Sequence, residues 1–189
     1  MIIVMHIVFI IGMHRCGTSF LASTYTNKGF SIGKNKNKDI DWQNPRGYFE
    51  NDSFTEFHTR LLEKNGKSWK TIRHQCIYDD SDVAEYRKLI EQEFGSDKMC
   101  VIKDPRLTFM VGLIKEACEN DIDYKIVFAT RNKTECVRSL CKAQKIKHKD
   151  AEELYEASHK QIEDFEIVDY KQTRENSELY DPKLYREKV

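Results

Sequence analysis

The chain has 189 residues, of which 40% are hydrophobic and 33% charged, and its 31 basic side chains are balanced by 31 acidic ones. This length suits one domain with a substantial core, and the ordinary apolar content argues against disorder over most of the chain. A net charge of zero argues against a dedicated nucleic-acid-binding protein, which usually carries a basic excess. Any anion site must therefore be a local cluster.

The first apolar run, residues 2–11, is predicted to be a buried strand. It lacks the basic segment and the cleavage site of a signal peptide, and it is too short to span a bilayer. The six cysteines show neither a Cys-x-x-Cys pair nor zinc-ligand spacing, so we expect reduced thiols, mostly in the core. These patterns predict a cytoplasmic protein with no membrane span and no cysteine-based zinc site.

Helices and strands are expected to alternate along the rest of the chain. After a helix over about 17–28, residues 31–48 are predicted to form an irregular polar loop. Apolar periodicity and capping residues predict further helices over about 51–65, 81–94, 107–119 and 132–145, and a polar one from 150. Short apolar runs predict further strands at 99–102, 124–129 and 165–170.

This alternation predicts an α/β fold in which a parallel sheet is flanked by helices in three layers. We expect a single domain over residues 1–189, with its core over about 2–170 and a polar tail over 171–189. Three short motifs directly follow predicted strands: "GMHRCGTS" at 12–19, "KDPR" at 103–106 and "RN" at 131–132. Ligands bind beyond the carboxyl ends of parallel strands, so these motifs are expected to meet at one edge of the sheet.

The first motif has nearly the spacing of a phosphate-binding P-loop. Gly12 and Gly17 permit a tight turn in which successive backbone N–H groups and a helix N-terminus face one anion, and Ser19 can add a hydroxyl donor. However, Thr18 stands where a nucleotide-hydrolysing enzyme keeps the lysine that it uses together with Mg²⁺. Arg15, inside the loop, can instead meet charge that develops on a bridging oxygen.

Together, the motifs resemble those of sulfotransferases that use 3′-phosphoadenosine 5′-phosphosulfate (PAPS). "GMHRCGTSFLA" resembles their 5′-phosphosulfate loop, and "RNKTECVRSL" resembles their 3′-phosphate element, with Arg131 and Ser139 at the family's separation. "NPRGYFEN" and "KDPR" resemble motifs of the bacterial and carbohydrate-type branch. The resemblance covers roughly residues 2–170 and implies the P-loop NTPase-like sulfotransferase fold. Cys16 departs from the usual serine, and "RNK" departs from the common "RNP".

The resemblance implies transfer of a sulfuryl group from PAPS to a hydroxyl or amine of a carbohydrate or other small acceptor, without a metal, leaving PAP. Arg15 would hold the 5′-phosphosulfate and ease departure of the phosphate oxygen, and Lys103 would steady the sulfuryl group. The donor-binding residues implied are Gly12, His14, Arg15, Cys16, Gly17, Thr18, Ser19 and Phe20, with Arg131 and Ser139 at the 3′-phosphate. Trp42, Tyr48, Trp69 and His74 are candidates for stacking on the acceptor.

The base that removes the acceptor proton is open between three residues. Glu50 is the first candidate, although a carboxylate at the start of a helix can serve the helix alone. Asp104 is the second, and it can instead orient Arg106 or cap the following helix. His58 is the third, and its neighbour Phe57 suggests packing instead.

Other functions fit parts of the pattern. A P-loop kinase or NTPase can place Asp104 on Mg²⁺, but it lacks the loop lysine. A cysteine phosphatase can use Cys16 at a helix N-terminus, where the pKa of the thiol is expected to drop, but it needs an arginine where Ala22 stands. A degenerate module that binds PAP or PAPS without turnover is the non-enzymatic alternative.

Overall fold

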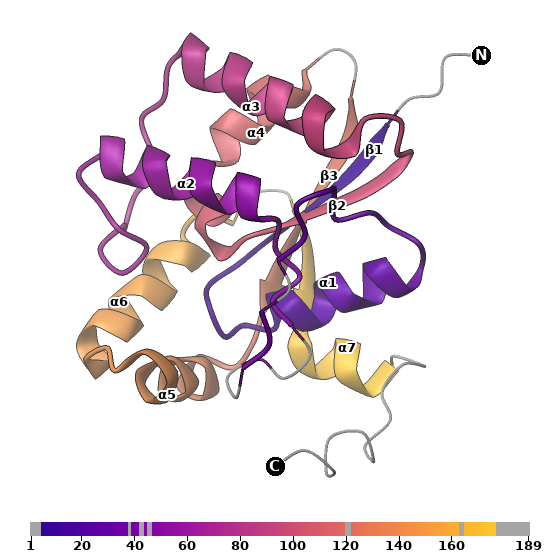
Figure 1. Cartoon of the computed structure of the whole chain (residues 1–189). Coiled ribbons are helices and arrows are strands. Elements are labelled where there is room, and N and C mark those ends of the chain that lie inside the picture. The colour runs from indigo at the N-terminus through magenta and orange to yellow at the C-terminus, as the bar shows by residue number, and fades with distance from the viewer. Residues whose placement is uncertain are drawn as a thin grey trace.

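The computed structural model describes residues 5–37, 39–41, 44, 47–119, 122–162 and 165–176 (Figure 1). Its strands are β1 (His6–Ile11), β2 (Met99–Lys103), β3 (Asp123–Thr130) and β4 (Glu166–Asp169). Its helices are α1 (Thr18–Asn27), α2 (Asp52–Lys64), α3 (Asp80–Phe94), the 3₁₀ helix η1 (Pro105–Phe109), α4 (Val111–Cys118), α5 (Lys133–Gln144), α6 (His148–His159) and α7 (Tyr170–Asn176). In these residues no helix is both long and apolar enough to cross a membrane.

The four strands form one parallel sheet in the order β2-β1-β3-β4. Strand β1 lies between two neighbours, so Ile7 aligns with Cys100 of β2 and with Tyr124 of β3. Side chains of β1 alternate between two cores, with Phe9 on one face and Val8 on the other, and both are fully buried. A strand covered on both faces needs the continuous apolar run seen here.

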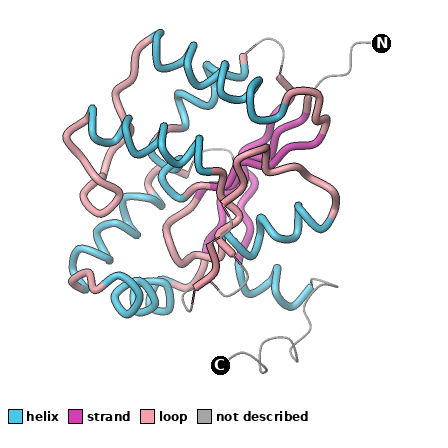
Figure 2. Tube along the Cα trace, in the orientation of Figure 1, coloured by secondary structure: helices cyan, strands magenta, loops and turns pink. Residues whose placement is uncertain are grey.

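Helices cover both faces of this sheet, as Figure 2 shows. The larger core receives side chains from α2, α3, α4, α5 and α6. The smaller core is closed by α1, through Leu21 and Ala22. Helix α7 begins beside α1, where Tyr170 meets Phe20 edge-on (Figure 1). The predicted α/β fold, a parallel sheet flanked by helices in three layers, is therefore confirmed.

Two segments differ from the sequence-based prediction. The single helix expected over 107–119 is η1 followed by α4, because Asp104 caps a short turn and the chain bends at Met110 before α4 begins. The sequence predicted a strand over 165–170 and a polar tail from 171, yet the helix α7 occupies Tyr170–Asn176. Its first turn is held by the side chain of Asp169, which accepts hydrogen bonds from the backbone N–H groups of Lys171 and Gln172.

The predicted irregular loop is fastened to α3 at one buried carboxylate. Glu93 is only 4% exposed and accepts hydrogen bonds from Asn35, Asn51 and Ser53. Asn51 also caps α2, because its side-chain oxygen accepts from the backbone N–H groups of Ser53 and Phe54. These bonds fix the start of α2. The residues just before it, Tyr48 and Glu50, line the pocket described below. Lys38, Trp42, Gln43, Pro45 and Arg46 lie outside the described residues.

Candidate functional site

Two glycines shape the turn after β1, residues 12–17, which we call the glycine loop. Gly12 has φ 131°, and a Cβ there would lie 2.3 Å from the carbonyl oxygen of Ala129 in β3. Gly17, with φ 90°, is the N-cap of α1. Arg15 also has a positive φ, 72°, an uncommon conformation for a residue with a side chain. The loop thus brings an arginine and a helix N-terminus to the carboxyl end of β1.

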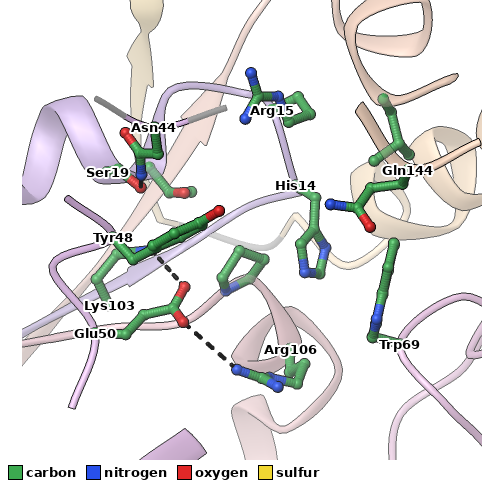
Figure 3. Close-up of a pocket in the computed structure, with 13 residues that line it drawn as sticks. His14, Arg15, Ser19, Asn44, Tyr48, Glu50, Trp69, Lys103, Arg106 and Gln144 are labelled. Carbon is green, nitrogen blue, oxygen red and sulfur yellow. Dashed lines mark hydrogen bonds and ion pairs between the residues drawn. The ribbon is translucent and has the colours of Figure 1, made fainter. Parts of the chain in front are cut away.

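A pocket of about 230 Å³ opens beside the glycine loop (Figure 3). The loop and α1 contribute His14, Arg15, Thr18 and Ser19, and the "KDPR" motif contributes Lys103, Pro105 and Arg106. Segments before and after α2 contribute Asn44, Tyr48, Glu50 and Trp69, and α5 contributes Leu140 and Gln144. The structure therefore brings the first two sequence motifs together at one edge of the sheet.

The predicted residues Lys103 and Glu50 form an ion pair in this pocket. Lys103, 3% exposed at the end of β2, places Nζ 2.6 Å from Oε1 of Glu50. The guanidinium of Arg106 lies 3.7 Å from the other oxygen of Glu50. Figure 3 shows the carboxylate between the two cations. A carboxylate and two cations thus share the space in front of the glycine loop.

The other two candidate bases, Asp104 and His58, are turned into the protein. Asp104 accepts hydrogen bonds from Nε of Arg106 and lies 2.8 Å from Nδ1 of His58. Burial alone would raise the pKa of Asp104, but the guanidinium of Arg106 and the imidazole of His58 hold it well below its usual range. Nε2 of His58 lies 3.3 Å from the hydroxyl of Tyr86. Neither Asp104 nor His58 lines the pocket, whereas Glu50 does.

His14 forms another wall of the pocket with Trp69. Their rings are 4.4 Å apart at 34°, and Figure 3 shows both beside Gln144. Burial, and then the charge of Arg106, lowers the pKa of His14 to about 3. The imidazole is therefore neutral at physiological pH. Sequence reasoning placed His14 among the donor-binding residues only through its position in the loop, and it missed Gln144.

The predicted 3′-phosphate pair is divided between the two sides of the glycine loop. Ser139 accepts a hydrogen bond of 3.0 Å from Nε of Arg15. Arg131 instead pairs with Glu135 at 2.9 Å, and its guanidinium lies 4.9 Å from the centre of the Tyr170 ring. Both Arg131 and Ser139 lie close to the loop, but neither lines the pocket described above.

Tyr170 is a neighbour of the glycine loop that sequence reasoning did not identify. Its ring lies against Gly17, where an added Cβ would come within 2.4 Å of it, and it meets Phe20 with centroids 5.7 Å apart. Phe20, the predicted adenine contact, therefore packs against Tyr170, whose ring also lies beside the guanidinium of Arg131. Tyr170 directly follows β4, and this position at the carboxyl edge of the sheet was the signal available in the sequence.

Cys16 is buried beneath the loop, beside Cys136. Burial and the adjacent thiol of Cys136 raise the pKa of Cys16 well above its usual range. This direction is opposite to the drop expected at a helix N-terminus, because the thiol is removed from solvent and lies against a second thiol. A cysteine phosphatase needs an accessible thiolate, so the structure disfavours that alternative.

The candidate acceptor-stacking residues have different surroundings. Tyr48 and Trp69 line the pocket, and the hydroxyl of Tyr48 donates to Asp41 at 2.7 Å. His74 lies in a separate open depression beside α6, and Trp42 is outside the described residues. Asn44 donates a hydrogen bond of 3.0 Å to the hydroxyl of Ser19 and so joins the long loop to the start of α1.

Comparisons with known proteins do not identify a family for this chain. No family model matches the sequence, and no curated protein matches it. Among solved structures, a deoxyadenosine kinase from M. mycoides with bound dATP aligns with 86% of this chain and 90% of its own. The TM-score is 0.44 and the sequence identity 13%. At this level of likeness the site must be interpreted from its own residues.

Proposed function

We propose that this protein is a PAPS-dependent sulfotransferase acting on a hydroxyl or amine of a carbohydrate or other small acceptor. One observation carries the proposal: a glycine loop with Thr18 in place of lysine holds Arg15 beside the same pocket as the Lys103–Glu50 ion pair. Such a site offers backbone donors and fixed cations to a donor phosphate, and a carboxylate to an acceptor. It combines the three roles that sulfuryl transfer needs.

In the proposed reaction the acceptor oxygen or nitrogen attacks sulfur, and the bond from sulfur to the phosphate oxygen breaks. The glycine loop and Arg15 hold the 5′-phosphosulfate and stabilise the charge that appears on the departing oxygen. Lys103 meets the sulfuryl oxygens, and Glu50 takes the acceptor proton. Positioning of the two substrates supplies much of the remaining acceleration.

We assign binding of the 3′-phosphate to Arg131, just before α5, and to Ser139 on α5. An arginine and a hydroxyl make a charge-assisted receptor for a phosphate. In the present structure the Ser139 hydroxyl accepts from Arg15, and Arg131 is paired with Glu135. When the donor binds, Arg15 must therefore exchange Ser139 for the 5′-phosphosulfate. Arg131 and Ser139 must exchange their present partners for the 3′-phosphate.

The acceptor side of the pocket is bounded by Tyr48, Trp69 and Gln144. A volume of about 230 Å³ is below the range of most drug-sized ligand sites, so the pocket suits one ring of an acceptor at a time. Two aromatic walls and an amide fit the apolar faces and hydroxyl groups of a sugar ring. This supports a carbohydrate acceptor without naming it.

A P-loop nucleotide kinase or NTPase is the second candidate. Lys103 favours it, because this buried lysine reaches the loop pocket from β2 and can supply the cation that Thr18 lacks. Asp104 disfavours it, because a carboxylate held by Arg106 and His58 does not face the loop to receive Mg²⁺. A module that binds PAP or PAPS without turnover is separated from both enzymes by a turnover assay.

Calorimetric titration with PAP in the absence of Mg²⁺, and with ATP in its presence, tests the proposal. We expect PAP to bind with micromolar affinity, about −8 kcal/mol. Arg131→Ala should weaken PAP binding at least about tenfold. Arg138→Ala, on the exposed side of α5, is the matched control and should bind like the wild type. Binding of ATP with Mg²⁺ but not of PAP would favour the kinase.

A further inference from the structure

Two free cysteines meet beneath the glycine loop. The sulfur atoms of Cys16 and Cys136 lie 2.7 Å apart, about 0.7 Å more than the length of a disulfide bond. Cys16 immediately precedes Gly17, and Cys136 lies in the first turns of α5. A small movement of either side chain therefore brings the two sulfurs to bonding distance.

The pair lies next to a contact that belongs to the proposed donor site. Arg15, adjacent to Cys16, donates to Ser139, which follows Cys136 by one helical turn. The thiol of Cys136 also lies 3.4 Å from the carbonyl oxygen of His14, another residue of the loop. Three successive loop residues thus contact α5, and a covalent link at Cys16 would fix all of these contacts.

We propose that Cys16 and Cys136 form a reversible disulfide that locks the glycine loop onto α5. A low-molecular-weight disulfide such as oxidised glutathione is the oxidant. A thiolate of the pair attacks it, giving a mixed disulfide and one free thiol, and the second cysteine then displaces the other thiol. The two cysteines lose two protons and two electrons, and the oxidant is released as two thiols. A dithiol reductant reverses the reaction.

Burial sets the rate of this reaction. Both sulfurs are fully enclosed, and burial raises the pKa of Cys16, so the reactive thiolate is scarce while the loop is closed. Oxidation therefore follows opening of the loop and is slower than oxidation of an exposed thiol. Once formed, the bond is shielded from reductant by the same packing.

The effect on donor binding rests on the proposed function. Arg15 and Ser139 must exchange their mutual hydrogen bond for contacts to PAP. A disulfide beside them holds that bond closed, so the oxidised protein should bind PAP at least about tenfold more weakly than the reduced protein. The cross-link itself does not depend on which nucleotide the loop binds.

The first test is chemical. The native full-length protein is incubated with oxidised glutathione, quenched with acid and an alkylating reagent, and mapped by mass spectrometry. We expect a peptide pair joined through Cys16 and Cys136, lost on reduction with dithiothreitol. Cys16→Ser and Cys136→Ser should lack it, and Cys141→Ser, a control for another cysteine of α5, should retain it. No cross-link, a mixed disulfide only, or a link between other cysteines overturns the proposal.

The second test is titration of the oxidised and reduced wild type with PAP. A loss of affinity on oxidation, restored by dithiothreitol and absent in Cys136→Ser, supports the lock. Equal affinity of the two forms overturns its effect on the donor site. Failure of the reduced wild type to bind PAP instead overturns the proposed sulfotransferase function, and the mass spectra still decide whether the cross-link forms.

Discussion

Nζ of Lys103 and Oε1 of Glu50 are 2.6 Å apart, and both residues line the pocket. Lys103 comes from the end of β2, and Glu50 from the segment before α2, so the pair joins two distant parts of the sequence. Because Lys103 is almost completely buried, its charge depends on Glu50 for compensation. The same contact holds the carboxylate toward the pocket, where an acceptor would approach.

Replacing Glu50 with glutamine should abolish most turnover and leave donor binding intact. The amide keeps the size of the side chain but cannot accept the acceptor proton, so we expect kcat to fall at least about 100-fold. The affinity for PAP should remain within about threefold, because the donor is held by the loop and Arg131. The measurement is transfer of labelled sulfate from PAPS to a panel of glycosides and phenols, with calorimetry for PAP.

Glu56→Gln is the matched control for this variant. Glu56 is exposed on α2, six residues after Glu50 in the sequence, and its substitution should change neither kcat nor PAP affinity. Equal turnover by Glu50→Gln and the wild type would remove Glu50 as the base. A collapse of the melting temperature in Glu50→Gln would instead identify the carboxylate as mainly a partner for Lys103.

Stability should fall as the pH drops below about 6.5, in part because of His14. The pKa of His14 is lowered to about 3 in the folded protein, and that of an unfolded histidine is about 6.5. Between these values the unfolded chain binds a proton that the folded protein does not, so acid favours unfolding. At pH 5.5 the contribution of His14 amounts to about 1 kcal/mol, or roughly 2–4 °C in melting temperature.

His14→Phe should flatten the decline of melting temperature between pH 6.5 and 4.5. Phenylalanine keeps a ring against Trp69 but does not titrate. Part of the decline should remain, because burial also lowers the pKa of His159. The control, His148→Gln, replaces an exposed histidine and should follow the wild-type curve. Parallel curves for His14→Phe and the wild type would show that folding does not lower the pKa of His14.

The sequence allowed the sheet and the anchors of the site to be predicted because these features are local. The apolar run of β1 predicts a strand buried on both faces, and the glycine spacing after it predicts the loop. The residue types there predicted a helix cap at Asn51 or Asp52, and the structure places it at Asn51, whose side-chain oxygen accepts from the backbone N–H groups of Ser53 and Phe54. "KDPR" was expected at the same edge because parallel strands align their carboxyl ends.

The partners of these residues could not be predicted, because they depend on packing between distant segments. No local sequence pattern indicates that Glu50 pairs with Lys103. None indicates that Asp104 contacts His58 and faces away from the pocket. The pKa of Cys16 depends on burial against Cys136 of α5, and the position of Cys16 before a helix gives no sign of that burial in the sequence. Tyr170 was not identified because the predicted strand over 165–170 included it, whereas in the structure β4 ends at Asp169 and Tyr170 begins the polar helix α7.

Asn51 should tolerate aspartate poorly, although aspartate is usually an equally good helix cap. Nδ2 of Asn51 lies 2.7 Å from a carboxylate oxygen of the buried Glu93, so Asn51→Asp would bring two carboxylates together and lose a donor. We expect a loss of about 2 kcal/mol or more in the free energy of unfolding. Asn132→Asp is the control, because Asn132 caps α5 at an exposed position, and it should cost less than about 0.5 kcal/mol.

Gly12→Ala should be among the most damaging small substitutions in this protein. An added Cβ would lie 2.3 Å from the carbonyl oxygen of Ala129, a backbone atom of β3 that cannot move aside without disturbing the sheet. The φ of 131° adds strain for any residue with a side chain. We expect a loss of about 3 kcal/mol or more in the free energy of unfolding, measured by denaturant titration.

Gly66→Ala separates the two causes, because Gly66 also has a positive φ but has no atom within 4 Å of an added Cβ. That variant should lose only about 1 kcal/mol. Equal losses at the two positions would mean that backbone conformation, and not the approach of β1 to β3, makes glycine necessary at the start of the loop.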